Sequence, residues 1–338
     1  MSKAELLTRT EWLALHYDRE HMSASQASAA LGMNPHTTPL ALYATRRGDL
    51  PAAEESLAMR LGHMLEPVVA KLYEDETGRP TYDPGEYAII RHPNAPWLFA
   101  TLDRRTSRIS KRWGDRIMQT VCIPHDVPYE MDSDGALELK TTGSYSKGEW
   151  EGDAPLHHQI QLQIQMFCAG LAWGSLAALV GNAHFFWYDY DRQAEDVEWK
   201  ILERLQDFRK RVMAGNPPDP SRTDLDVVKA MFPTEHGETV DVAGAAEHFR
   251  RWRETKAMLK QATQDEAEAR AQLILDIGDA AYLHDDGRPL VAYKAQTRKG
   301  RLTIGEEWAE AATTAGIPFK RTEGGVIRVM RSIGGEDD

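Results

Sequence analysis

The chain has 338 residues, of which 42% are hydrophobic and 27% charged, and its formal net charge is −12. This length suits one large folded domain with an appendage, and the composition excludes a mostly disordered chain. The acidic balance argues against a simple nucleic-acid-binding domain, which is usually basic. It does not argue against a nuclease, whose cation site needs clustered carboxylates.

The sequence has no apolar run that approaches the roughly 20 residues needed to span a bilayer. The first five residues also lack the apolar core of a signal peptide. We therefore expect a soluble cytoplasmic protein, without a membrane partner. The two cysteines, Cys122 and Cys168, are too few for a four-cysteine metal site, and we expect reduced, partly buried thiols.

Helical and strand patterns alternate along the first two thirds of the chain, which predicts a mixed α/β core. Short helices are expected over residues 8–50, the first of them capped by Thr10. Residues 54–77 predict a longer helix, because apolar residues recur there at helical spacing: Leu57, Leu61, Met64, Val68 and Leu72. Strand patterns follow over 86–103 and 136–140.

Residues 159–166 fit two patterns. Four glutamines alternate there with apolar residues, as in a strand, but Ile160 and Ile164 also fit one face of a helix. We favour the helix, because Pro155 is suited to a helix start and Gly170 to its end. A hairpin over 175–190 and a helix over about 195–213 are expected next.

A Gly- and Pro-rich stretch at residues 215–221 predicts a domain boundary. We expect a core domain over 1–220 and a C-terminal extension over 221–338. The extension should contain a long charged helix over 244–277, a β-hairpin with an Asp-Gly turn over 281–294, and a strand near 325–330.

Glu138 and Lys140 are the first candidates for chemistry. Residues two apart on a strand point to the same face, so this carboxylate and this ammonium project together while Leu137 and Leu139 point to the core. The carboxylate suits a hard cation such as Mg²⁺, and the lysine suits orientation of the attacking water or stabilisation of transition-state charge. Alone, Glu-x-Lys is a weak signal, since such pairs usually lie on a solvated strand.

Two further carboxylates strengthen the hypothesis. Asp103 ends an apolar strand, although an aspartate there can also simply begin a turn. Glu66 lies beside the apolar stripe of its helix, one turn after Gly62, which would allow another element to approach closely. Pro67 is awkward inside a helix and indicates a kink or a later start.

Glu66, Asp103, the Glu138-x-Lys140 pair and a later glutamine follow one another along the chain. In this order of residues the chain resembles the PD-(D/E)XK nucleases, specifically the YqaJ-like viral recombinase branch that includes lambda exonuclease. The resemblance covers roughly residues 8–220. It is carried by five segments in the family's order: Met22–Gln26, Gly62–Glu66, Phe99–Asp103, Leu137–Lys140 and Pro155–Gly170. It implies a restriction-endonuclease-like fold, with a mixed central sheet flanked by helices.

The resemblance also implies roles. Asp103 and Glu138 resemble the metal ligands, with the Leu139 carbonyl as a third and Glu66 as a direct or water-mediated support. Lys140 resembles the catalytic lysine. Gln161 best fits the glutamine near the attacking water, with Gln163 as second choice. The residues expected to contact DNA are Ser25, Arg19, Gln163, Arg104 and Arg105, of which Ser25 resembles the serine that contacts a 5′-phosphate.

The expected activity is therefore that of a Mg²⁺- or Mn²⁺-dependent exonuclease acting on double-stranded DNA ends. The resemblance suggests 5′-to-3′ digestion for phage-type recombination, a single-strand annealing protein as partner and a ring-shaped trimer. The gap between Asp103 and Glu138 is longer than the family pattern, so residues 104–135 are interpreted as an insertion that contacts DNA or forms a solvated hairpin.

Two alternatives stay open. An endonuclease of the same fold would use the same residues, and a non-catalytic DNA-binding or phage structural protein would carry these carboxylates incidentally. Other motifs favour ordinary structure: His157 and His158 as a helix-surface pair, and most of the nine tryptophans as core and rim residues. The sequence contains no Gly-x-x-x-x-Gly-Lys loop of the kind that holds phosphates, so we do not expect ATP binding.

Overall fold

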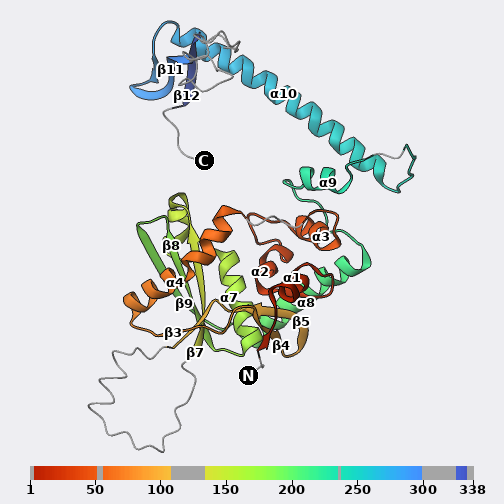
Figure 1. Cartoon of the computed structure of the whole chain (residues 1–338). Helices are drawn as coiled ribbons and strands as arrows, with labels where there is room; N and C mark the ends of the chain where they lie inside the picture. Colours follow the sequence, from red (N-terminus) through yellow and green to blue (C-terminus); the bar gives the residue numbers. More distant parts are fainter. Residues whose placement is uncertain (1–3, 52–55, 108–133, 235–236, 299–324, 333–338) are drawn as a thin grey trace, which may run out of the picture. The chain divides into compact units, whose positions relative to one another are not determined.

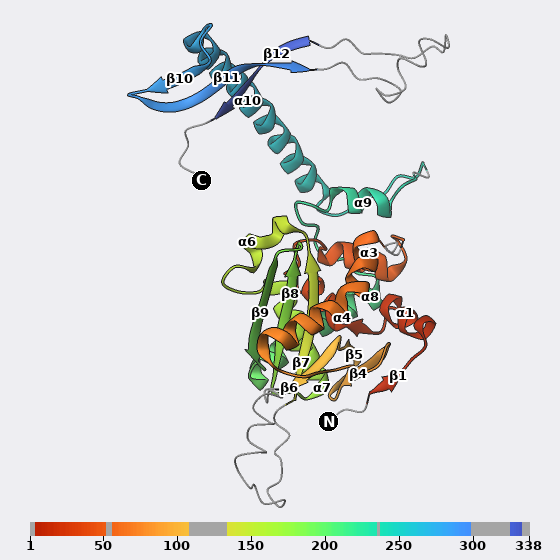
Figure 2. The ribbon, with the colours of Figure 1, turned by 60° about the vertical axis from the view of Figure 1, so that its left-hand side comes forward.

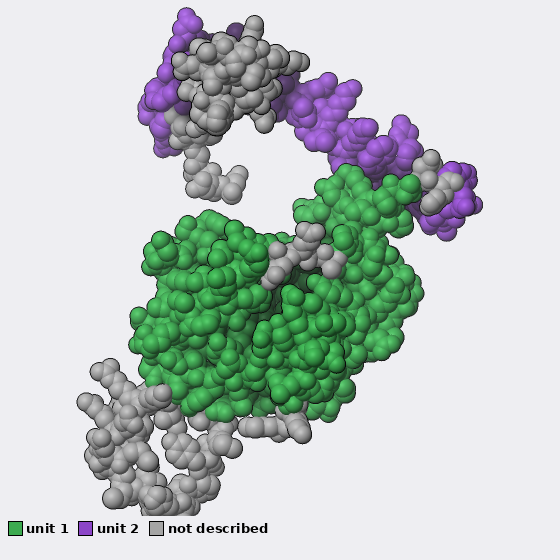
Figure 3. Space-filling model, in the orientation of Figure 1, with its two compact units in different colours: residues 1–236 green, residues 237–338 purple. Residues whose placement is uncertain are grey.

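The computed structural model describes residues 4–51, 56–107, 134–234, 237–298 and 325–332. The chain divides into two compact units, residues 1–236 and 237–338 (Figure 3). This division lies beyond the boundary near residue 220 that the sequence predicted. The reason is α9 (Leu225–Met231), which packs against α3 (Pro39–Arg47). Asp224 reinforces that contact by accepting a hydrogen bond from the Thr38 hydroxyl.

The first unit is built on two sheets. The larger has the strand order β3-β6-β7-β8-β9, and only β7 and β8 are parallel, so the sheet is mixed as the sequence predicted. Its strands are β3 (Thr81–Tyr82), β6 (Arg104–Ser107), β7 (Asp134–Thr142), β8 (Trp173–Val180) and β9 (His184–Asp191). The smaller has the order β1-β4-β5-β2, formed by β1 (Glu5–Leu6), β4 (Ala88–His92), β5 (Ala95–Thr101) and β2 (Met22–Ser23).

Two helices cover opposite faces of the larger sheet. α4 (Leu57–Thr77) packs on β7 and β8 from one side, and α7 (Leu156–Ala169) packs on them from the other (Figures 1 and 2). α7 confirms the helical interpretation of the glutamine-rich segment. It ends at Gly170, whose φ of 67° places it in the left-handed region that favours glycine.

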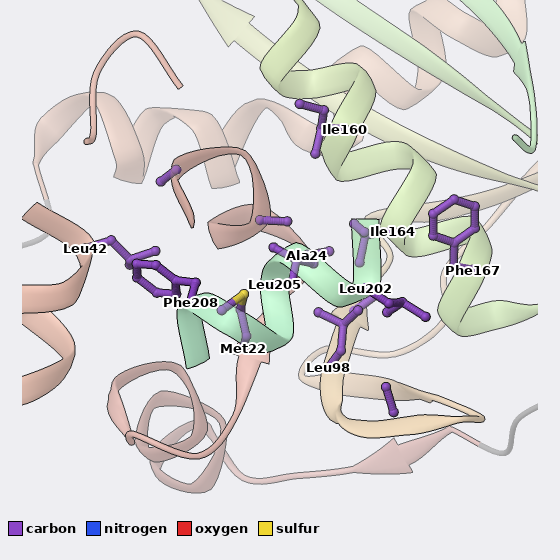
Figure 4. Close-up of a cluster of buried hydrophobic side chains, with 14 of the residues drawn as sticks. Met22, Ala24, Leu42, Leu98, Ile160, Ile164, Phe167, Leu202, Leu205 and Phe208 are labelled. Atoms are coloured by element: carbon purple, nitrogen blue, oxygen red, sulfur yellow. The ribbon is translucent and has the colours of Figure 1, made fainter. Parts of the chain in front are cut away.

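The remaining helices of this unit gather beside the smaller sheet. They are α1 (Arg9–Tyr17), α2 (Ala24–Ala30), α3 and α8 (Glu195–Ala214), with the short η1 (Ser144–Ser146) and α6 (Lys147–Trp150) following β7. Thr8 caps α1, not Thr10, and its hydroxyl accepts from the amide of Glu11. Side chains from β2, β5, α7 and α8 meet in one apolar core (Figure 4), among them Met22, Leu98, Ile164, Leu205 and Phe208.

The helix over 57–77 is confirmed, but its apolar stripe faces solvent instead of the core. Met64 is 73% exposed, and Leu57, Leu61 and Val68 are exposed as well. The buried side chains of α4 are Val69, Ala70 and Tyr73, in its second half. Pro67 lies inside the helix without ending it. Spacing therefore identified the helix, whereas its buried face was set by where α4 meets the sheet.

The second unit contains the long helix α10 (Ala245–Ile277) and a sheet with the order β10-β11-β12. Its strands are β10 (Tyr282–Asp285), β11 (Arg288–Arg298) and β12 (Gly325–Ser332). The predicted helix, hairpin and final strand are thus confirmed. Within the described ranges, no helix is long and apolar enough to cross a membrane.

Candidate active site

β7 carries residues toward both covering helices. Leu137 and Leu139 belong to a core cluster with Val69 and Tyr73 of α4. Glu138 and Lys140 alternate with them and therefore lie on the α7 face. The Glu138 side chain is not solvated: the residue is only 1% exposed. A carboxylate buried this deeply is costly unless hydrogen bonds or charges compensate it.

Three side chains supply that compensation. The Lys140 ammonium and the Gln161 amide both donate to Oε1 of Glu138, the latter at 2.6 Å. Gln165 donates to Oε2. Gln161 also accepts from the Lys140 ammonium at 3.4 Å, so the lysine, the carboxylate and the amide form a closed triangle. The α7 face of the sheet thus fixes the orientation of both Glu138 and Lys140.

Asp103 reaches the same strand from the short link between β5 and β6. Its Oδ2 accepts a hydrogen bond from the backbone N–H of Leu139 at 2.8 Å. β6 pairs with β7 only up to Leu137, so the edge of β7 beyond that residue is open to the aspartate. The N–H and the carbonyl of one strand residue leave on the same side. The Leu139 carbonyl is therefore directed to the side where Asp103 lies.

The charged groups at this edge of β7 shift one another's pKa. Burial raises the pKa of Asp103 well above its ordinary value, and the neighbouring Glu138 carboxylate raises it further. Burial alone would lower the pKa of Lys140, but Glu138 and Asp103 more than offset this, and the net shift is upward. The lysine is therefore held as an ammonium, and one cation faces more than one buried carboxylate.

Glu66 is a more distant member of the cluster. Its charge contributes to the raised pKa of both Asp103 and Lys140, so it lies within electrostatic reach of them. Its Oε1 is 3.0 Å from Nδ1 of His63, on its own helix. A Cβ added at Gly62 would stand 3.6 Å from the hydroxyl of Thr141, which shows how close α4 runs to β7.

These groups fit a hard divalent cation. Among the described residues, no three His, Cys, Asp or Glu side chains form a ready-made metal cage. Asp103, Glu138 and the Leu139 carbonyl instead offer an incomplete set of oxygen donors. Mg²⁺ is commonly held in this way, by one or two carboxylates with water and substrate phosphate completing its shell. The chemistry of these oxygen donors is what favours a cation there, and the raised pKa of Asp103 agrees with it, since a positive charge would lower that pKa again.

One predicted glutamine lies elsewhere, and another was missed. The Gln163 amide donates to the backbone carbonyl of Asp191 at 3.0 Å and accepts from the backbone of Gln193, so it ties α7 to the end of β9. Gln165 takes the place beside Glu138. The sequence carried the signal, because a helix brings positions four apart to one face, and Gln165 is four residues after Gln161.

The predicted DNA-contacting residues do not join the carboxylate cluster as one group. Ser25 is exposed near the start of α2, and its hydroxyl is 2.9 Å from that of Ser23. Arg19 donates to the backbone of Arg47 at 2.9 Å. Both arginines line a surface hollow together with Arg46.

Arg104 and Arg105 lie next to Asp103 in sequence and pair with acidic side chains. Arg104 is 3.6 Å from a carboxylate oxygen of Asp83, and Arg105 donates to Asp134 at 2.8 Å. Residues 108–133, the main part of the proposed insertion, lie outside the described residues, as does Cys122. Cys168 is a buried free thiol, as expected.

His157 and His158, expected as a surface pair, are half-buried at the start of α7. The ring of His158 stacks on Trp150 with centroids 5.5 Å apart, and His157 meets His36 edge to face at 5.8 Å. Burial, with a smaller contribution from Lys140, lowers the pKa of His158 to about 2. Trp150 and Trp173 are fully buried, in agreement with a structural role for these two tryptophans.

Comparison with known proteins shows which family the chain resembles. Residues 11–172 match the model of the YqaJ-like viral recombinase domain. The uncharacterized protein YqaJ of Bacillus subtilis (strain 168) is 25% identical over 312 residues, which cover 88% of this chain and 89% of that protein. A crystal structure of an alkaline exonuclease (LHK-Exo) from Laribacter hongkongensis is 20% identical, with a TM-score of 0.44 over 61% of this chain and 94% of its own.

A second structure of LHK-Exo, in complex with dAMP, is 18% identical, with a TM-score of 0.43 over 65% of this chain and 96% of its own. The family match spans Ser25, Glu66, Asp103, Glu138 and both glutamines of the candidate site. Residues 11–172 of this chain therefore belong to the YqaJ-like viral recombinase domain family.

Proposed function

We propose that this chain is a divalent-cation-dependent deoxyribonuclease whose catalytic residues are Asp103, Glu138 and Lys140. The observation that carries the proposal is the buried Glu138 carboxylate, which is bonded to Lys140 and lies one residue from the backbone amide that holds Asp103. A carboxylate, an ammonium and a second carboxylate at one strand edge are the groups that phosphodiester hydrolysis needs.

A bound cation would supply Lewis-acid activation of water and charge neutralisation at the phosphate. The protein's own contribution is orientation. Gln161 and Gln165 fix the two oxygens of Glu138. The Lys140 ammonium, kept protonated by its carboxylate neighbours, can donate to the attacking water or to a phosphate oxygen as negative charge develops there. Glu66 adds negative charge from the α4 side.

The finer part of the proposal concerns the substrate. We propose that linear duplex DNA is digested from its ends, 5′ to 3′, to prepare strands for annealing, with Mg²⁺ or Mn²⁺ as the cation. Support comes from the family of residues 11–172 and from the basic hollow that Arg19 lines. A trimeric ring and an annealing protein as partner belong to the same proposal.

The test is digestion of linear duplexes with 5′-phosphate or 5′-hydroxyl ends, with Mg²⁺, with Mn²⁺ and with EDTA. Cation-dependent release of nucleotides is expected, with faster digestion of the 5′-phosphorylated strand. Lys140→Ala and Glu138→Gln should each lower the rate by roughly 100-fold or more. Absence of cleavage with either cation would leave the non-catalytic alternative standing.

A covalently closed circle separates the two kinds of nuclease. An exonuclease leaves it intact, whereas an endonuclease opens it and then yields shorter fragments. Lys71→Ala provides a matched control for Lys140→Ala. Lys71 is an exposed lysine on α4 that pairs with Asp75 at 2.6 Å, away from Glu138, so its loss should leave digestion unchanged.

A further inference from the structure

The long helix α10 of the second unit (Figure 2) exposes several large apolar side chains. Phe249 is 56% exposed and Trp252 57%, and Leu259 is exposed as well. Their positions follow the three- and four-residue steps of one helix face. The rings of Phe249 and Trp252 lie side by side with centroids 5.9 Å apart, so they form a continuous aromatic surface.

Cations share this face with the rings. Arg253 lies over Phe249 at 5.9 Å, and Lys256 lies over Trp252 at 4.9 Å. The two rings and these two cations, with Leu259 and Lys260, line one shallow hollow, which we call the ring-cation face. Within the described residues, none of its three cations has a carboxylate partner in an ion pair.

The acidic residues of α10 are segregated from this face. At about 100° per residue, Glu247, Glu254, Asp265, Glu268 and Asp276 fall on the opposite half of the helix. Glu266 lies on the flank, where it pairs with Arg270 at 3.4 Å. A protein with a net charge of −12 therefore presents a local surface that is cationic and aromatic at once. Such a surface is complementary in charge to a polyanion.

The placement of rings and cations on one face also indicates which kind of molecule can bind there. A helix that lies on a membrane keeps its cations on the face opposite its rings, whereas here both share one face. A second copy docked through this face would bring Arg253, Lys256 and Lys260 against like charges. A single nucleic-acid strand offers what the face lacks, since its bases stack on rings while its phosphates meet cations.

We infer that the ring-cation face of α10 binds single-stranded DNA. The bases would stack on Phe249 and Trp252, and Arg253, Lys256 and Lys260 would contact the phosphates. The choice of DNA as the polymer rests on the proposed function, because digestion of one strand of a duplex leaves the other single-stranded. The binding itself uses no residue of the nuclease site.

The experiment measures binding of the full chain to a fluorescent oligothymidine of about 20 nucleotides by polarisation, in EDTA, so that no cleavage occurs. Trp252→Ala should weaken binding about tenfold, since loss of a stacking ring is costly at such sites. The double variant Lys256→Glu, Lys260→Glu should weaken it at least as much. It should also reduce the salt dependence, by about 0.7 in the logarithmic slope for each phosphate that the protein no longer neutralises.

The matched control is Arg250→Glu combined with Arg251→Glu. It reverses the same number of charges on the same stretch of α10, outside the ring-cation face, and should weaken binding less than threefold. Equal losses in both double variants, or no loss with Trp252→Ala, would overturn the inference. So would binding of phosphatidylserine vesicles in place of the oligonucleotide.

Circular dichroism would verify that α10 stays helical in each variant. Cleavage of a short duplex in Mg²⁺ is measured separately. Retained cleavage together with weakened oligonucleotide binding supports the inference. Absent cleavage in the parent chain refutes the proposed function but leaves the binding result interpretable.

Discussion

The side-chain amide of Gln165 donates to one carboxylate oxygen of Glu138, and it does so from a position that is itself fully buried. The same amide also donates to the backbone carbonyl of Thr101 at 2.9 Å. One α7 residue therefore joins the end of β5, which leads to Asp103, to the carboxylate of β7. The two halves of the candidate site are held together by this contact.

Gln165→Leu should lower both stability and nuclease activity. It leaves an oxygen of Glu138 and the carbonyl of Thr101 without their donor, at a cost of about 1–3 kcal/mol for each buried group. Gln163→Leu is the matched control: it also removes buried hydrogen bonds of α7, but those lead to β9. Urea unfolding should show losses in both variants, and digestion assays a loss in Gln165→Leu alone. Equal activity in the two would contradict a positioning role for Gln165.

Asp103→Asn should move stability and activity in opposite directions. Burial and Glu138 raise the pKa of Asp103, so its ionised form is destabilising without a cation. With the uncharged asparagine side chain, the midpoint of urea unfolding in EDTA should be unchanged or higher, while the cleavage rate falls by roughly 100-fold or more. Addition of Mg²⁺ should raise the melting temperature of the parent chain but not of this variant.

Asp75→Asn controls for the loss of one negative charge, because Asp75 is exposed and pairs with Lys71 on its own helix. Cleavage and stability should both stay near those of the parent. A cation-induced rise in melting temperature that persists in Asp103→Asn would place the cation elsewhere.

His158 should make the protein less stable in mild acid. Its folded-state pKa is about 2, against an ordinary value of 6.5. Below pH 6.5 the unfolded chain takes up a proton that the folded protein does not, so the stability present above that pH is lost as the pH falls. The slope from this one group is at most about 1.4 kcal/mol per pH unit.

His158→Phe should flatten that slope, because the new ring can keep the stack on Trp150 but does not titrate. Urea unfolding at several values between about pH 5 and pH 7 measures the difference between variant and parent. Parallel stability curves for the two proteins would contradict the prediction.

Glu198→Ala should destabilise the first unit by about 3 kcal/mol or more. Glu198 is buried on α8, 2.8 Å from Nε2 of the buried His92 of β4, and it also bonds Arg192. Its removal leaves two partners without their acceptor. Glu195→Ala, in the exposed first turn of the same helix, should change the free energy of unfolding by no more than about 0.5 kcal/mol. Similar values for both would mean that the network contributes nothing.

Gly174→Ala should cost about 1–3 kcal/mol. A Cβ at Gly174 would stand 2.9 Å from the backbone carbonyl of Ala136 and 2.8 Å from a methyl group of Leu162, so β8 could not stay this close to β7 and α7. Gly148→Ala is the control, since nothing lies within 4 Å of a Cβ at that position. Thermal unfolding should show a lower midpoint for the first variant only.

Several parts of the site could be predicted from the chain. Glu138 and Lys140 share a face of β7 because strand alternation is a local property. The prediction of a helix for the glutamine-rich segment was correct. It rested in part on Gly170 as the end of the helix, and Gly170 does end α7 in the left-handed conformation that glycine adopts freely. A helix also places Gln165 on the same face as Gln161. This residue was missed because all four glutamines of the segment alternate with apolar residues in the same way.

Other features depended on contacts far apart in the sequence. The spacing of Leu57, Leu61 and Met64 predicted a helix, but its apolar stripe faces solvent because α4 meets the sheet through Val69 and Tyr73. The boundary moved to residue 236 because α9 folds back on α3.

By itself the sequence determined the longer helices and strands and the residue types available for chemistry, because these follow from backbone preferences over a few residues. Only the tertiary structure decided that Asp103 meets the backbone of Leu139, and that two amides of α7 enclose one carboxylate. Those pairings join segments that lie 23 to 36 positions apart. They depend on how helices and sheets pack, which local periodicity does not encode.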